Sequence, residues 1–324
     1  FRRVLFRSFT GPLGATANVT GTLDNPVLTG ALAAKGLRMR SSLVGADIQN
    51  IEATGSFDAS HLSLQRFAGT TSNGGKVVGS GTIDLSAIAT KGVGIDLRLA
   101  ATNAQLIRRD DMSATVTGPL RVISDGNGGT IAGRVRIDQA SWALGKASAA
   151  TELPSIKTRE INAPADIAPA RAPSAPWSFM IDALAPNRVD VRGMGLDSEW
   201  GADIRLRGTT AAPQITGTAE VIRGAYEFAG KRFDLTRGKI RFTGGTPIDP
   251  QLDIVATGDA NGVNATISIT GTAAHTSIAF SSTPALPEEE LLSRLLFGTS
   301  ITQISAPEAV QLASALASLR GGGG

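Results

Sequence analysis

Apolar and polar residues alternate one by one through much of this chain. Because successive side chains of a β-strand point to opposite faces, such alternation places apolar side chains on one face of a sheet and polar ones on the other. No convincing helical period occurs before residue 285, so the chain is predicted to be all-β. The alternation is clearest in residues 61–65, 95–99, 134–138, 203–207, 239–242 and 266–269.

A degenerate internal repeat accompanies the alternation. Residues 21–30 and 208–217 both begin with Gly-Thr, carry Pro in the middle and end with Thr-Gly, and residues 271–280 fit the same frame loosely. Pro has no backbone N–H to donate, so it belongs at the start or the edge of a strand. Repeats of this kind predict an elongated antiparallel sheet that grows by the addition of similar amphipathic strands.

Composition excludes several classes of protein. The 324 residues carry a net charge of only +3, and Lys and Arg never form a block, which argues against binding to nucleic acid. No apolar run approaches the length of about eighteen residues that a membrane helix needs. The absence of Cys excludes disulfides, thiol nucleophiles and thiolate metal sites.

The chain divides into segments of different composition. The two strand-rich segments flank a Pro/Ala-rich connector that is expected to be extended. The predicted organisation is a repetitive β-segment, the connector, a second β-domain, and a C-terminal region of two short helices with a Gly-rich end, over residues 9–149, 150–176, 177–285 and 286–324.

The two helices are expected near residues 287–297 and 306–319. Three Glu residues follow Pro287, where carboxylates are favoured by the helix dipole. Ser305 and Glu308 have the spacing of a capping box at the start of the second helix.

Motifs that carry catalysis are absent from the sequence. His61 and His275 are the only histidines, and each lies within an alternating segment, where a surface role is the commoner one. Residues 69–76 superficially resemble a phosphate-binding loop, but the glycine spacing is wrong and Val77 stands where that loop has Ser or Thr. We therefore expect no enzyme activity, no cofactor and no metal site.

Three structures would use a one-sided apolar pattern. In a β-sandwich the apolar faces pack on each other. A transmembrane barrel also alternates but carries aromatic girdles, which three Trp and one Tyr do not supply. The third structure is a long curved sheet whose apolar face lines an open trough for lipid chains. Alternation alone does not separate a filled sandwich from a trough.

The C-terminal part of the chain resembles the C-terminal domain of the TamB family. The similarity covers about residues 180–324, and several motifs occur in the order of the family. They are LDSEW at 196–200, RGAYEFAGKRFDLTRGKIRFTGG at 223–245, DPQLDI at 249–254 and ELLSRLLFG at 290–298.

This resemblance implies a fold, a location and a partner. Members of the family are anchored in the inner membrane of Gram-negative bacteria by one N-terminal helix. Their periplasmic β-body is folded into a taco-like groove with an apolar interior. They are associated with an outer-membrane barrel partner, TamA, with outer-membrane protein assembly and protein secretion, and with phospholipid transport. The anchor is missing here and the family continues beyond the final Gly run, so the chain is expected to be a periplasmic fragment truncated at both ends.

The expected function is therefore a periplasm-spanning bridge that carries phospholipid acyl chains, supports outer-membrane protein assembly, or does both. The alternative is a scaffold that presents strand edges to the barrel partner without lipid transport. By parity within each strand, the residues expected to line the groove are Tyr226, Phe228, Phe233, Leu235, Ile240, Phe242, Leu252, Ile254, Ile267 and Ile269. Ordinary core packing is the competing role for each of them.

The first eight residues differ from everything that follows. Residues 1–8, FRRVLFRS, match one translation frame of a common sequencing-adapter oligonucleotide, and we interpret them as adapter-derived. The alternative is the frayed end of a longer protein.

If residues 1–8 derive from the adapter, the encoding nucleotides should reproduce the adapter sequence, and a genomic copy of the gene should read upstream through different codons. Sequencing the chromosomal locus tests this prediction. The same octapeptide encoded in an intact chromosomal gene would contradict it.

Overall fold

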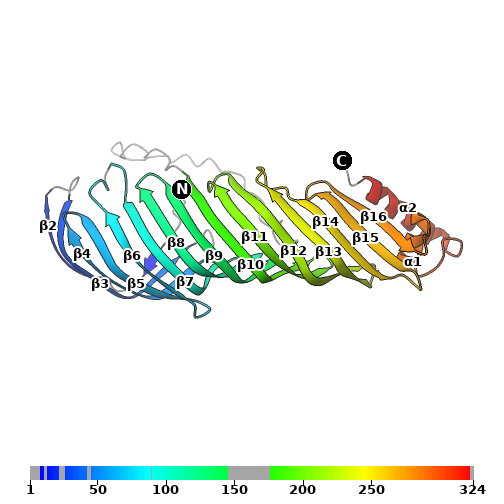
Figure 1. Ribbon diagram of the computed structural model, residues 1–324, viewed down its shortest axis with the longest axis horizontal. Helices are drawn as coiled ribbons and strands as arrows, with labels where there is room; N and C mark the ends of the chain where they lie inside the picture. Colours follow the sequence, from blue (N-terminus) through cyan, green and yellow to red (C-terminus); the bar gives the residue numbers. More distant parts are fainter. Residues whose placement is uncertain are drawn as a thin grey trace, which may run out of the picture.

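The computed structural model describes residues 8–10, 13–21, 26–41, 45–88, 90–144 and 176–321. Within these residues, sixteen strands form one sheet and two helices follow (Figure 1). The strands are β1 (Ser8–Thr10), β2 (Leu13–Gly21), β3 (Pro26–Arg40), β4 (Asp47–Asp58), β5 (His61–Thr71), β6 (Lys76–Asp84), β7 (Gly94–Arg108), β8 (Met112–Asp125), β9 (Gly129–Ala143), β10 (Trp177–Gly193), β11 (Leu196–Gly208), β12 (Pro213–Phe228), β13 (Lys231–Thr243), β14 (Gln251–Asp259), β15 (Asn264–Thr272) and β16 (Thr276–Thr283), and the helices are α1 (Glu288–Leu296) and α2 (Ala306–Gly321).

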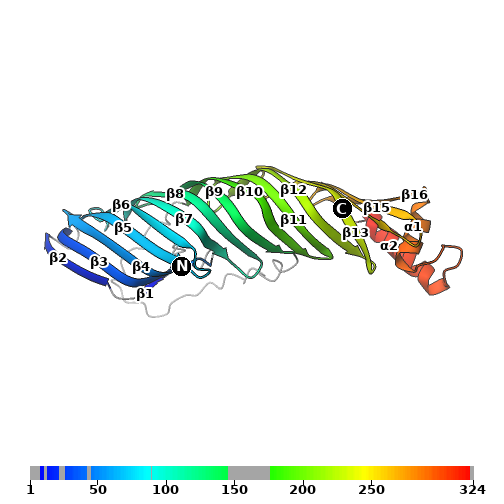
Figure 2. The same cartoon turned by 60° about the horizontal axis from the view of Figure 1, so that its bottom comes forward.

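The sheet is elongated, and its strands follow the chain order. From β3 to β16 each strand is hydrogen-bonded to the next, while β1 and β2 pair with different parts of β3 at one edge. Figures 1 and 2 show the strands side by side along the longest axis, with the helices at the β16 end. The predicted elongated, all-β sheet with two C-terminal helices is confirmed.

One strand pair departs from the antiparallel pairing that the sequence suggested. Strands β9 and β10 are parallel, with Trp177 opposite Gly129 and Arg192 opposite Ala143. A parallel pair needs a long crossover connection, whereas antiparallel neighbours are joined by tight turns. The Pro/Ala-rich connector supplies that length, since 33 residues separate Ala143 from Trp177. Most of the connector, residues 145–175, lies outside the described part of the chain, as do residues 1–7.

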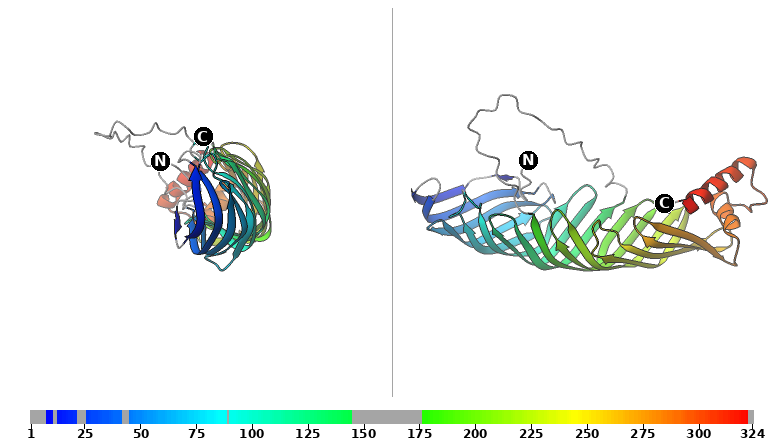
Figure 3. Two further views of the ribbon diagram at one scale, coloured as in Figure 1. Left: turned by 90° about the vertical axis from the view of Figure 1, so that its left-hand side faces the viewer. Right: turned by 90° about the horizontal axis from the view of Figure 1, so that it is seen from above.

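The sheet is curved about its long axis, as the end-on view in Figure 3 shows. Irregularities of the β-bulge type interrupt most strand pairs between β3 and β14. In the middle of the sheet they adjoin one another: the shift at Ala185–Val189 faces Gly201, next to the shift at Glu199–Trp200. A bulge bends its strand and increases the local twist. The strands therefore bend along a line that runs the length of the sheet.

A bulge with one extra residue also shifts the phase of the apolar pattern. Residues on the same face of a regular strand are two apart, but across such a bulge they are three apart. Thus Ala101 and Ala104 are both fully buried on β7, and Leu235 and Gly238 share a face on β13 on either side of Thr236. The extra residue keeps the apolar side chains on one face while the strand bends.

The helices begin close to the predicted positions. Helix α1 begins at Glu288, with Pro287 as the residue before it and three Glu residues in its first turn. At the start of α2, the backbone N–H and the hydroxyl of Ser305 both donate to Oε2 of Glu308, at 2.7 and 2.6 Å. The contact from the backbone N–H is the half of the capping box in which the Glu side chain reaches back to the start of the helix, as the Ser305–Glu308 spacing predicted.

Deletion of Thr236 should remove the β13 bulge and leave every apolar residue on its present face, because Leu235 and Gly238 would then be two apart. Deletion of Lys239 is the matched control, since it also shortens β13 by one residue but turns Arg237 toward the apolar face. We expect the Lys239 deletion to lower the free energy of unfolding by at least about 1 kcal/mol more than the Thr236 deletion. Denaturant titration measures the free energy of unfolding of both variants. Equal losses would contradict the role of the extra residue in keeping the apolar side chains on one face.

Candidate functional site

Rows of apolar residues cross the strands on one side of the sheet, which we call the concave face. Antiparallel or parallel partners that lie directly opposite each other point to the same side, so the register identifies its residues. One unbroken row of such partners crosses ten strands, from β3 to β12, without a polar residue. The row is Ala34, Ala53, Phe67, Gly79, Leu99, Leu120, Gly133, Ile181, Leu206 and Ile215.

Glycines in this row have a packing role. A Cβ on Gly79 would come within 2.5 Å of a methyl carbon of Leu99, and one on Gly133 within 2.7 Å of a methyl carbon of Leu120. The leucine side chains therefore lie over their glycine neighbours on the adjacent strands. The recurring glycines of the sequence thus give an even apolar surface on the concave face.

A second row continues this surface toward the C-terminal end. It joins Ala185, Ala202, Ala219, Ile240, Leu252 and Gly271, one on each strand from β10 to β15. The two rows overlap on β10, β11 and β12. The concave face is therefore apolar from β3 to β15.

Burial varies along the concave face. A cluster on β3 to β9 contains Ile48, Ile51, Val77 and Val116, all at least 92 % buried. In the middle, the larger side chains of β10 and β11, such as Phe179, Ile181, Ile204 and Leu206, are only half-buried. In a β-sandwich, the second sheet would bury the apolar face of this one. The middle of the sheet therefore presents an open apolar surface.

The structure separates the ten residues expected to line the groove into two groups. All ten lie on the concave face. One group packs into a cluster with the helices. The other lies further along the same strands, outside that cluster, and is half-buried. The first group is Phe233 and Ile267, with Tyr226, Phe228, Leu235 and Ile269 packed against them. The second group is Ile240, Phe242, Leu252 and Ile254.

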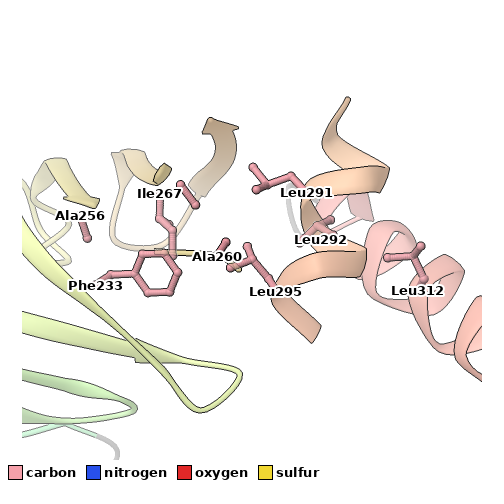
Figure 4. Packing of buried hydrophobic residues seen from close by; sticks show 9 residues of the cluster. Phe233, Ala256, Ala260, Ile267, Leu291, Leu292, Leu295 and Leu312 are labelled. Carbon is pink, nitrogen blue, oxygen red and sulfur yellow. The ribbon is translucent and has the colours of Figure 1, made fainter. Parts of the chain in front are cut away.

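Helix α1 covers the first group. Leu291, Leu292 and Leu295 are 0–1 % exposed, and Figure 4 shows Leu291 and Leu295 directed from α1 toward the strand side chains. Leu312 of α2 lies on the far side of α1 and is 3 % exposed. Full burial of a leucine stabilises a fold by about 2 kcal/mol. Leu291, Leu292 and Leu295 therefore hold α1 in place with roughly 6 kcal/mol.

Polar contacts fix the C-terminal end of α1. The ammonium of Lys231 donates to the carbonyl of Arg294 at 3.3 Å, and the amide of Asn261 donates to the carbonyl of Gly298 at 2.5 Å. Lys231 and Asn261 lie at the turn ends of β12–β13 and β14–β15, so both hold α1 against the same rim of the sheet. Glu290 accepts hydrogen bonds from Arg294 and from the backbone N–H of Ile301, and both lower its pKa.

The opposite, convex face carries cross-strand ion pairs. From β9 to β14 every adjacent pair of strands is joined by one, and their oppositely charged groups lie 2.6–3.9 Å apart. The hydrogen bond from Arg207 lowers the pKa of Asp182, and the one from Lys239 lowers the pKa of Glu220. Exposed pairs add little stability, but they place charge on this face, where Met180 and Leu184 of β10 are also exposed. The pairs are Arg134–Asp182, Arg207–Asp182, Arg223–Glu199, Lys239–Glu220 and Arg237–Asp253.

No catalytic arrangement occurs in the part of the chain that the structure describes. Nε2 of His61 lies 3.4 Å from a carboxylate oxygen of Asp84, and both side chains are exposed. Within the described ranges, no three His, Cys, Asp or Glu side chains lie close enough to hold a metal ion. No helix there has both the length and the apolar character to cross a membrane.

Reasoning from the sequence missed two parts of the site. It did not identify the N-terminal cluster around Ile51, whose signal is the three-residue spacing of Ile48 and Ile51 in an alternating segment. It also did not identify α1 as a cover for the concave face. The signal was the apolar stripe formed by Leu291, Leu292, Leu295 and Leu296, because such a stripe on a helix needs an apolar surface to pack against.

The family model described as the TamB C-terminal domain matches residues 65–324. No curated protein matches the chain.

Replacing Leu295 with Ala should loosen α1, because it leaves a cavity against Phe233 and Ala260. We expect a loss of about 2–5 kcal/mol locally, seen as faster hydrogen exchange of the α1 amides. Val310→Ala is the matched control, since Val310 on α2 is 67 % exposed and its truncation should cost less than about 0.5 kcal/mol. Unchanged exchange in α1 after Leu295→Ala would contradict the role of α1 as a fixed cover.

Proposed function

Because the chain belongs to the TamB family, whose members act in the translocation and assembly module, we propose that its concave face carries the acyl chains of phospholipids across the periplasm. The observation that carries this proposal is the unbroken apolar row across ten strands. A closed core would not need such continuity along the long axis. A path for lipid would.

The energetics favour such a path. Each CH₂ group held in water costs about 0.8 kcal/mol, so an acyl chain of roughly sixteen carbons meets a barrier on the order of 10 kcal/mol. The half-buried residues Phe179, Ile181, Ile204 and Leu206 of β10 and β11 give a chain apolar contact in the middle of the sheet. The two apolar rows continue this contact onto the neighbouring strands.

The proposal includes a location and a partner. In this family the β-body lies in the periplasm and an N-terminal helix anchors it in the inner membrane. An outer-membrane barrel of the TamA type would then receive one end of the bridge. An enzymatic step plays no part in this proposal, because movement along an apolar face requires no bond to form or break.

A scaffolding role is the rival function, and the terminal strands favour it. Strand β16 is the last strand of the path in the described residues, and β1 and β2 form the opposite edge. Such edges can accept a strand from a barrel partner by β-augmentation. The scaffold needs the edges but not the apolar character of the concave face.

A charge on the concave face should separate the two functions. Phe242→Asp places a carboxylate among Ile204 and Gly217 on the neighbouring strands, where an unpaired charge is costly. We expect loss of outer-membrane integrity in cells that carry this variant in the full-length protein. Arg241→Asp is the matched control, because it introduces the same residue at the adjacent, exposed position.

The abundance and folding of both variants must first be shown to match the parent. Purified protein with a photoreactive residue at position 240 should then form lipid adducts, and protein labelled at position 241 should not. Full activity of a folded Phe242→Asp variant, or equal labelling at both positions, would leave the scaffold as the better account.

A further inference from the structure

We propose that α1 is a fixed wall that restricts acyl chains to one half of the concave face at the C-terminal end of the sheet. This inference rests on the proposed lipid-carrying function and names the part of the face that serves it. The open half contains Ile240, Phe242, Leu252 and Ile254. The other half, around Phe233 and Ile267, is closed by α1.

Strand β13 shows the contrast within a single element. Phe233 and Phe242 lie on the same face of this strand, on either side of the Thr236 bulge. Phe233 is fully buried beneath α1 together with Leu291 and Leu295, whereas Phe242 is half-buried. Only the half that contains Phe242 is open to a ligand.

Helix α1 has the contacts of a wall and not of a lid. Its displacement would return three fully buried leucines to water and break the hydrogen bonds from Lys231 and Asn261. The buried side chain of Ser293 also donates to the carbonyl of Thr299, which fixes the loop after the helix. These contacts join α1 both to the rim of the sheet and to its own following segment.

The open half continues toward the edge of the sheet. The row Ala219, Ile240, Leu252 and Gly271 leads from β12 to β15, and none of these residues belongs to the cluster beneath α1. An acyl chain that follows the concave face therefore passes Ile240 and Leu252 toward Gly271, outside that cluster.

Four phenylalanines allow a matched test. Replacing each in turn by p-azidophenylalanine preserves the ring and adds a photoreactive group. Phe179 on β10 reports on the face before the helices, Phe242 on the open half, and Phe228 and Phe233 on the half beneath α1. Each variant of the full-length protein is irradiated with radiolabelled phospholipid vesicles. Phe228 is only partly buried, so it decides the result if the azide at the fully buried Phe233 prevents folding.

We expect lipid adducts at Phe179 and Phe242, with about tenfold fewer at Phe228 and Phe233, because close packing excludes a ligand there. Mass spectrometry should show the azide at Phe228 joined to the peptide that contains Phe280, whose ring centroid lies 5.5 Å from that of Phe228, which would confirm that the group reacts. Equal lipid labelling at Phe228 and Phe242 would overturn the wall while the proposed function stands. The absence of lipid labelling at both Phe179 and Phe242 would overturn the proposed function itself.

Discussion

The apolar side of a single long sheet must be kept from water without a second sheet to cover it, and the rest of the structure depends on this constraint. Curvature supplies part of the cover, because the row of bulges bends the strands so that side chains of the concave face approach one another. The three-residue spacings at Ala101–Ala104 and Leu235–Gly238 keep the apolar pattern in phase through the bend. Where bending is not enough, α1 completes the cover.

The two faces divide the chemistry of the molecule. Ion pairs between successive strands place charge on the convex face, where Met180 and Leu184 of β10 are also exposed. Leucines of α1 bury part of the concave face, and what remains open is a strip that runs past Phe179, Leu206 and Ile240. The open apolar surface is therefore the part of the concave face that α1 and the buried clusters do not cover.

Alternation in the sequence was enough to predict the strands, and the Glu residues after Pro287 and the Ser305–Glu308 spacing predicted the two helices. Ile240 and Phe242 lie on one side of the Thr236 bulge, so parity within their segment places both on the same face. The parallel pairing of β9 and β10 was not predictable, since it depends on contacts between strands far apart in the chain. The division of the ten candidates by α1 has the same cause: parity states which way Phe233 points, but not what packs on it.

The parallel seam between β9 and β10 bears on how the chain folds. Every other described strand from β3 onward can pair with its predecessor after a short connection, so these strand pairs form as hairpins. Pairing of β10 with β9 must close a loop about ten times longer than a tight turn, at an entropic cost about 2 kcal/mol greater. Loop closure therefore favours pairing within β1 to β9 and within β10 to β16 before β9 pairs with β10.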